Sequence, residues 1–336
     1  MKFVCIFITY LNFISNKYNL KVFLSPNYPF DKLLLPLYTL NIMKLEYKVT
    51  KPQKYTNIRQ VLMNEFNLSA RLILKLKRAN QIYLNTNSTH IHHPLNINDI
   101  VSVDIAFEED CENIVPTKMD LDILYEDDCL LIVNKVPNMP VHPSLNHYED
   151  SLSNGVKYYF TSQGLKRKIR PINRLDKDTS GIVLFAKNEY IQECLIKQMK
   201  TNIFEKEYLA LVSGILTTNK QTVIAPIARK ETSIIERCVK EDGDYAETDI
   251  ELINIYENYS LIQCKLKTGR THQIRVHTLH IGHPILGDTL YGSASSLINR
   301  QALHAHKVKF IHPITKKNIE ITCTIPKDML TLGTKY

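Results

Sequence analysis

The chain has 336 residues, of which 44% are hydrophobic and 23% charged, and 42 Lys and Arg against 34 Asp and Glu give a net charge of +8. This composition is typical of a soluble globular protein long enough for two domains, and the surplus of positive charge favours a polyanionic partner. The seven cysteines are odd in number, scattered and without a CxxC pair, a pattern that indicates neither a disulfide framework nor a cysteine zinc site. Free thiols fit a reducing compartment, so we expect a cytoplasmic protein.

The amino-terminal residues 1–42 contain the apolar run Phe3–Ile14, which resembles a membrane or export signal. The run is shorter than the roughly 20 residues that a transmembrane helix needs, and Asn12 interrupts it. No alanine that would suit a cleavage site occurs before Ala70. We therefore expect no membrane association. Residues 1–42 are interpreted as an extension that is disordered or lies upstream of a true start at Met43.

Residues 43–107 are predicted to form a small module. Thr56 is a candidate N-cap for a first helix and Ser69 for a second. The apolar faces of the two helices are predicted from residues at helical spacing: Ile58, Val61, Leu62 and Phe66, then Leu72, Ile73 and Leu76. A short strand is expected at Gln81–Asn85, and a turn at Asn98-Asp99 precedes an alternating strand at Ile100–Ile105.

The second helix of this module carries a basic stripe. Arg71, Lys75 and Arg78 stand at positions i, i+4 and i+7, which lie on one helical face. Two short helices with such a stripe, followed by small strands, resemble the RNA-binding module shared by ribosomal proteins and several RNA-modifying enzymes. That resemblance implies contacts to RNA phosphates, whereas the plain alternative is a solvated helix face.

Residues 108–117 read as an acidic linker, and residues 118–330 as a second domain of different texture. Apolar runs alternate there with loops and a few helices. Strands are expected at four of these runs: Leu130–Val133, Ile182–Ala186, Tyr208–Val212 and Leu261–Leu266. The pattern predicts an α+β fold with a large mixed, mainly antiparallel β-sheet flanked by helices.

The segment Arg170–Lys187, RPINRLDKDTSGIVLFAK, places two carboxylates in a polar loop directly before an apolar strand. Asp176 and Asp178, followed by Ser180 and Gly181, suggest a calcium loop. The twelfth position of that loop should be Glu, but it is Lys187, whose charge would repel the ion.

The same segment resembles the H-R-L-D-x-x-T-S-G motif of the RluA-type RNA pseudouridine synthases. Arg174, Leu175, Asp176 and Thr179-Ser180-Gly181 match it, while Asn173 stands where the family most often has His. The resemblance implies that Asp176 is the catalytic nucleophile and that Arg174 helps to displace the target base. The departure at Asn173 removes any role for an imidazole there.

Three further segments resemble family motifs in the family's order, within a stretch that runs from about Ile123 to Pro326. Val133–Pro143, VNKVPNMPVHP, is similar to an early structural segment, in which Asn138 suits a left-handed turn. Lys206–Gly214, KEYLALVSG, supplies Tyr208, and Leu266–His277, LKTGRTHQIRVH, supplies Arg275. The resemblance implies that Tyr208 faces the active site and that Arg275 pairs with the nucleophile.

Four histidines near the last motif offer a metal-binding alternative: His272, His277, His280 and His283. We expect Thr271 to cap a helix that Gly282 and Pro284 end. On that helix His272 and His277 would point about 140° apart, so that only two imidazoles share a face. Two ligands make an incomplete site, and no metal is predicted.

A pseudouridine synthase breaks the bond between the uracil nitrogen and ribose, turns the base and rejoins it through carbon 5, without cofactor or metal. A fixed cation, Arg275, would keep Asp176 ionised, and Tyr208 would hold the free uracil. We expect RNA as the partner, ribosomal RNA before transfer RNA, and a monomer by default. A non-catalytic RNA-binding or ribosome-assembly protein and a metal-dependent hydrolase stay open as alternatives.

Overall fold

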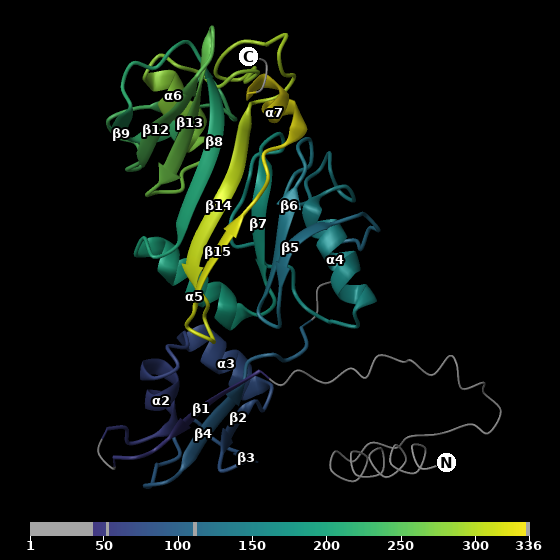
Figure 1. Cartoon of the computed structure of the whole chain (residues 1–336). Coiled ribbons are helices and arrows are strands. Elements are labelled where there is room, and N and C mark those ends of the chain that lie inside the picture. Colours follow the sequence, from purple (N-terminus) through teal and green to yellow (C-terminus); the bar gives the residue numbers. More distant parts are fainter. Residues whose placement is uncertain (1–42, 52–53, 110–112, 334–336) are drawn as a thin grey trace, which may run out of the picture. The chain divides into compact units, whose positions relative to one another are not determined.

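The computed structural model describes residues 43–51, 54–109 and 113–333 (Figure 1). None of the helices in these ranges is long and apolar enough to cross a membrane. The predicted extension, residues 1–42, lies outside them.

The predicted module folds as two helices and a four-stranded antiparallel sheet of order β1-β4-β2-β3. Its elements are β1 (Lys44–Lys48), α2 (Ile58–Asn64), α3 (Ala70–Arg78), β2 (Ile82–Leu84), β3 (Asn87–Ser88) and β4 (Ile100–Asp104). The expected apolar faces of both helices are buried and pack with Val101 and Val103 of β4. The module is therefore organised around the periodicities that its sequence shows.

The two helix starts of the module differ in how well the sequence predicted them. The Ser69 side chain accepts a hydrogen bond from the Leu72 N–H, so this N-cap is confirmed. The expected N-cap Thr56 is wrong by one residue, because Asn57 accepts from the Gln60 N–H instead. Asn and Thr are both good caps, and Thr56 bonds to the Gln60 side chain from just outside the helix.

The described residues from Asp122 onward are built on a nine-stranded sheet. Its strands follow the order β5-β6-β7-β14-β8-β13-β12-β9, and β15 pairs with β14. They are β5 (Asp122–Glu126), β6 (Leu130–Lys135), β7 (Ser180–Ala186), β8 (Glu205–Ser213), β9 (Lys220–Ile224), β12 (Glu247–Ile255), β13 (Tyr259–Leu266), β14 (Leu303–Ile311) and β15 (Asn318–Thr322). Among these strands one pair, β7 with β14, is parallel and the others are antiparallel. The predicted mixed, mainly antiparallel sheet is confirmed.

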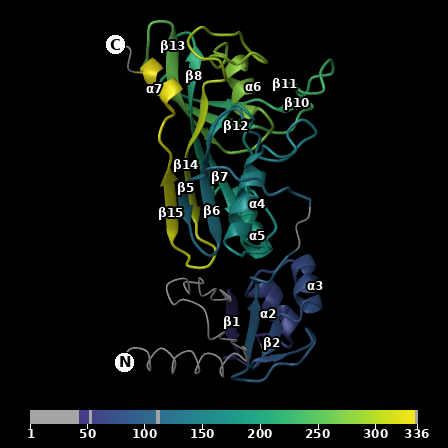
Figure 2. The same cartoon turned by 90° about the vertical axis from the view of Figure 1, so that its right-hand side faces the viewer.

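Helices cover both faces of this sheet because β6 and β7 are apolar on both sides. Leu131 and Val183 face one core together with Val156 and Phe160 of α4 (Leu152–Ser162). The alternate residues of the two strands face a second core with Ile191 and Leu195 of α5 (Glu189–Lys200). Helices α6 (Gln273–His280) and α7 (Lys327–Gly333) follow later in the chain. A short hairpin, β10 (Ile227–Arg229) with β11 (Arg237–Val239), lies beside α6 (Figure 2).

The register of three strands brings the polar loop before β7 close to Tyr208. Strand β14 lies between β7 and β8 (Figure 1), and Ala305 of β14 is paired with both Gly181 and Tyr208. Gly181 has φ +109°, and a Cβ at this position would lie 2.2 Å from the Ala305 carbonyl oxygen. Only glycine permits this approach, so Gly181 fixes how closely β7 meets β14 beside the site.

Candidate active site

The loop that carries Asp176 is tied to strand β6 by a buried lysine. The Lys135 ammonium donates to the carbonyls of Val136, Met139 and Lys177 at 2.9, 2.7 and 2.8 Å. The side chain is almost fully buried, and burial lowers the pKa of Lys135 to about 7. One side chain thereby joins the early motif segment to the loop of the nucleophile.

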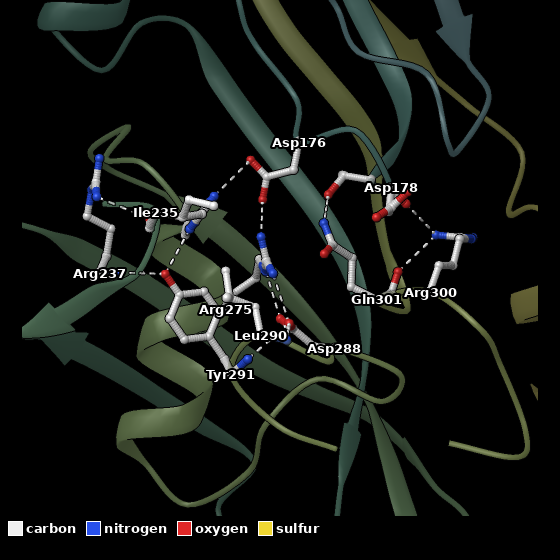
Figure 3. Close-up of polar contacts among 12 residues, drawn as sticks. Asp176, Asp178, Ile235, Arg237, Arg275, Asp288, Leu290, Tyr291, Arg300 and Gln301 are labelled. Atoms are coloured by element: carbon white, nitrogen blue, oxygen red, sulfur yellow. Dashed lines mark hydrogen bonds and ion pairs between the residues drawn. The ribbon is translucent and has the colours of Figure 1, made fainter. Parts of the chain in front are cut away.

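The other side of the same loop is held by two residues that precede β14 (Figure 3). Arg300 donates to the Asp178 carbonyl at 3.1 Å, and the Gln301 amide donates to the Thr179 hydroxyl at 2.7 Å. The Thr179 N–H donates to the Asp176 carbonyl, which closes the turn. Asp176 is therefore presented by a loop whose backbone is fixed on both flanks.

Asn173, which departs from the family motif, has a structural position. Its amide donates to the Ile182 carbonyl at 2.8 Å and its oxygen accepts from the Leu184 N–H at 2.9 Å. The side chain is buried and thus extends the pairing of β7 with the loop before it. An amide provides the donor and the acceptor that this place requires.

The start of α6 is anchored by Gln273. Its side-chain oxygen accepts from the Thr268 hydroxyl and the Arg270 N–H, and its amide donates to the Glu247 carbonyl and the Thr248 hydroxyl. The expected N-cap Thr271 is wrong, because His272 occupies that position. His272 has φ 58°, a left-handed conformation that non-glycine residues rarely adopt, and its side chain makes no capping bond. Gly282, with φ +83°, ends the segment as expected.

Arg275 of α6 links two carboxylates (Figure 3). Its Nη1 donates to Asp176 Oδ2 at 2.8 Å, while Nε and Nη2 donate to the two oxygens of Asp288 at 2.7 and 2.8 Å. Burial alone would lower the pKa of Arg275, but the hydrogen bonds and charge of Asp288, together with those of Asp176, raise it. The guanidinium is therefore a permanent cation beside Asp176.

Asp288 is itself held by the turn in which it lies. Its Oδ1 accepts from the backbone N–H groups of Leu290 and Tyr291 at 3.1 and 3.2 Å. Gly287 before it has φ +69°, and a Cβ there would lie 2.3 Å from the Arg300 carbonyl oxygen. The Tyr291 ring lies 4.9 Å from the Arg275 guanidinium carbon, within cation–π range. Asp288 and Tyr291 thus fix the orientation of Arg275.

A cavity of about 690 Å³ opens in front of Asp176, and Arg174, Lys206 and Tyr208 also line it. Burial, with the negative charge of Asp176, raises the pKa of the Tyr208 hydroxyl, so that it stays protonated at neutral pH. Burial lowers the pKa of Lys206. The cavity offers one carboxylate, one phenol and several basic side chains to a ligand of nucleotide size.

Comparisons with known proteins show the family of this chain. A family model described as RNA pseudouridylate synthase matches residues 129–280. The Bacillus subtilis protein named uncharacterized RNA pseudouridine synthase YjbO is 36% identical over 269 residues, which are 80% of this chain and 95% of that one. The chain belongs to the RNA pseudouridine synthase family.

Further members of this family match over more than half of the chain. Ribosomal large subunit pseudouridine synthase D of Zymomonas mobilis is 36% identical over 249 residues, 70% of this chain and 78% of that protein. The solved structure of human RNA pseudouridylate synthase domain containing 1 is 26% identical, has a TM-score of 0.52 and covers 61% of this chain and 83% of its own. Members of the family are isomerases that act on RNA.

The structure brings the predicted catalytic residues together although they lie far apart in the chain. Asp176 and Tyr208 line the cavity with Arg174, and Arg275 meets Asp176 from α6. Their catalytic roles are not tested by this geometry and stay predictions.

The predicted RNA-binding stripe of α3 does not line that cavity. Arg71 and Lys75 both pair with the buried carboxylate of Glu189 on α5, at 2.9 Å in the case of Arg71, while Arg78 is exposed. Part of the charge of the stripe is thus engaged within the protein. Contact of the stripe with RNA stays a prediction.

Sequence reasoning missed Asp288, Tyr291 and Lys206, and it treated His272 only as a metal ligand to be dismissed. A signal for Asp288 was present, since Gly287-Asp288 directly follows the apolar pair Ile285-Leu286. A glycine followed by an acid at such a place indicates a turn whose carboxylate needs a partner.

His277, one of the histidines that suggested a metal, is held by other groups. Both ring nitrogens of buried His277 lie in hydrogen-bond range, one of the Thr248 hydroxyl and the other of the Ala225 carbonyl. A different triad, Asp127, Cys129 and His312, has potential ligand atoms within 4.8 Å of one another. His312 Nδ1 accepts from two backbone N–H groups, which leaves Nε2–H to donate to Asp127 at 2.9 Å. The imidazole of this triad is therefore already used structurally.

Proposed function

We propose that this pseudouridine synthase converts specific uridines of large-subunit ribosomal RNA to pseudouridine, with Asp176 as its nucleophile. The observation that carries the proposal is the chain from Asp176 through Arg275 to Asp288 at the wall of a cavity of nucleotide size. Support for the RNA class comes from relatives named ribosomal large subunit pseudouridine synthase D, of which one is 36% identical.

The proposed reaction begins with attack of an Asp176 carboxylate oxygen on carbon 1′ of the target ribose. The bond from carbon 1′ to uracil N1 breaks, and its electron pair leaves with the base as a uracil anion. The base turns, and its carbon 5 bonds to carbon 1′ while the carboxylate departs unchanged. Carbon 5 then loses its proton and N1 gains one, so the product is an isomer of the substrate and no cofactor is consumed.

Arg275 supplies the electrostatic condition for this attack. A carboxylate in a closed pocket would take up a proton, because desolvation disfavours its charged form. A guanidinium at 2.8 Å favours the ionised carboxylate, and the bidentate pair with Asp288 keeps the guanidinium in place. Arg275 thus gives the Asp176 carboxylate a fixed ion-pair partner at the point of attack.

Tyr208 is proposed to hold the detached base. Its ring offers an apolar face in the cavity, on which a free uracil stacks. Since its hydroxyl stays protonated at neutral pH, it relays the proton that leaves carbon 5 and does not act as a phenolate.

A stacked uridine cannot reach Asp176, so the base must be flipped out of the RNA. Arg174 is exposed at the rim of the cavity and is proposed to fill the gap that the base leaves. Arg71, Lys75 and Arg78 are proposed to contact phosphates of the flanking duplex, which gives affinity with little sequence choice. We further propose a monomer that works in the cytoplasm without cofactor or metal.

Pseudouridine mapping of ribosomal and transfer RNA tests this function. RNA from cells that lack the gene is compared after complementation with the wild-type protein, Asp176→Asn or Asp178→Asn. We expect one or a few sites of large-subunit RNA to vanish, and to return with the wild type and Asp178→Asn only. If no site vanishes in cells that lack the gene, and the purified protein is inactive on these RNAs, the chain is a binding protein and the proposal is wrong.

A further inference from the structure

A second side chain besides Arg275 faces the carboxylate of Asp176. Arg275 binds Oδ2, while His272 Nε2 lies 3.8 Å from Oδ1. This separation exceeds a hydrogen bond, so His272 leaves Oδ1 free. His272 also lines the cavity, with 12% of its side chain exposed.

The proton of His272 is placed by Tyr291. The Tyr291 oxygen accepts from the Arg237 backbone N–H at 2.7 Å (Figure 3). The same oxygen lies 2.8 Å from His272 Nδ1. With that N–H as its donor, the tyrosine directs its own O–H to Nδ1, which makes Nδ1 an acceptor. A neutral imidazole then carries its proton on Nε2, the nitrogen that faces Oδ1.

The surroundings keep the ring neutral and immobile. Burial lowers the pKa of His272, and Arg275 and Arg237 act in the same direction, whereas Asp176 and Asp288 oppose them. The Tyr291 ring meets the imidazole edge to face, with centroids 5.6 Å apart. The left-handed backbone of His272, with φ 58°, is a strained conformation that this packing holds in place.

The stereochemistry of uridine indicates which group of the substrate the His272 Nε2–H would contact. In uridine the base and the 2′-hydroxyl lie on opposite faces of the ribose. A carboxylate oxygen that attacks carbon 1′ opposite the departing base therefore arrives on the face that carries the 2′-hydroxyl. A donor beside the attacking oxygen is then directed at that hydroxyl and not at the base.

We infer that His272 is a specificity residue, which donates a hydrogen bond from Nε2 to the 2′-hydroxyl of the target nucleotide and so selects ribose over deoxyribose. The inference rests on the proposed function, because it requires a uridine at Asp176. The 2′-hydroxyl is the group by which a protein distinguishes RNA from DNA at one site. Tyr291 acts through His272 as a positioning residue.

The test uses the full-length protein and an RNA stem-loop that contains its mapped uridine, made with ribose or 2′-deoxyribose at that nucleotide alone. Single-turnover rates on both substrates are measured for the wild type, His272→Gln and His272→Asn. Gln reaches the place of Nε2 with an amide donor, whereas Asn is too short. This pair of polar variants separates the hydrogen bond from loss of folding, which thermal melting checks.

We expect His272→Asn to shrink the ribose preference of the wild type about tenfold, which is the worth of one hydrogen bond, and His272→Gln to keep most of it. If His272→Asn slows both substrates by the same factor, His272 has no role at the 2′-hydroxyl. If the wild type does not convert the ribose stem-loop, the proposed function itself is wrong.

Discussion

Two clusters of charge in this chain are held in different ways. At the cavity, Arg275 and Asp288 are 7% and 1% exposed and form three hydrogen bonds with Asp176 and each other. On α3, Arg71 is 75% exposed and shares the carboxylate of Glu189 with Lys75. The buried side chains of the first cluster are fixed by their hydrogen bonds. In the second cluster the exposed Arg71 side chain can turn toward other partners. Charged side chains thus serve fixed chemistry in one region and adaptable contacts in the other.

The largest effect is expected from removing the central charge of the buried cluster. Arg275→Gln leaves Asp288 buried without its cation, which should lower the free energy of unfolding by about 3–5 kcal/mol and the modification rate more than 100-fold. Urea unfolding and single-turnover rates measure the two losses. Arg71→Gln is the matched control, for which we expect about 1 kcal/mol or less because Glu189 keeps Lys75. Equal losses of unfolding free energy in Arg275→Gln and Arg71→Gln would contradict the distinction between a fixed and an adaptable cluster.

Tyr208→Phe removes one hydroxyl from the same cavity without a change of charge. We expect a rate reduction of about 100-fold, as for loss of a proton-transfer group, with little loss of stability. Tyr190→Phe, a buried tyrosine of α5 outside the cavity lining, serves as its control. An unchanged rate in Tyr208→Phe would limit Tyr208 to stacking.

The contrast between buried and exposed groups extends to histidines. Burial lowers the pKa of His304 from its ordinary 6.5 to about 4, so that below pH 6.5 the unfolded chain binds a proton that the folded one does not. The free energy of unfolding should therefore fall as pH drops from 6.5 to about 4, by up to roughly 1.4 kcal/mol per pH unit for this residue. His304→Gln should flatten that slope in urea titrations, and His90→Gln, at an exposed site of the module, should not.

The smallest effect is expected on α3. Arg78→Gln should weaken RNA binding a few-fold for every sequence and reduce the slope of log affinity against log salt by about 1, as expected for one lost phosphate contact. Filter binding at several salt concentrations measures both changes. The control is Lys220→Gln on β9, whose partner is Glu251. If log affinity falls with log salt equally steeply in Arg78→Gln and Lys220→Gln, the basic stripe of α3 does not contact RNA.

Much of the fold was predictable because it follows from local patterns. The four expected strands of the second domain occur as parts of β6, β7, β8 and β13, and Ser69 caps α3 as its sequence indicates. The caps at Thr56 and Thr271 were misplaced, since each has a polar neighbour that competes for the position. The left-handed His272 could not be foreseen, because tertiary packing holds it there.

The candidate site was only half predictable. Asp176, Tyr208 and Arg275 were found through motif resemblance, but their meeting depends on the pairing of β7, β14 and β8, which no local pattern encodes. Asp288 and Tyr291 were missed because their roles depend on contacts with α6 residues earlier in the chain. Side chains that act by holding other side chains become visible only in three dimensions.

The central claim is that Asp176 performs the chemistry. Its most direct test is the single-turnover rate of pseudouridine formation on the mapped RNA by Asp176→Asn, beside Asp178→Asn two residues away. The account predicts a loss of at least about 1,000-fold for Asp176→Asn with RNA binding retained, and a change below threefold for Asp178→Asn. A rate near that of the wild type in Asp176→Asn would contradict it.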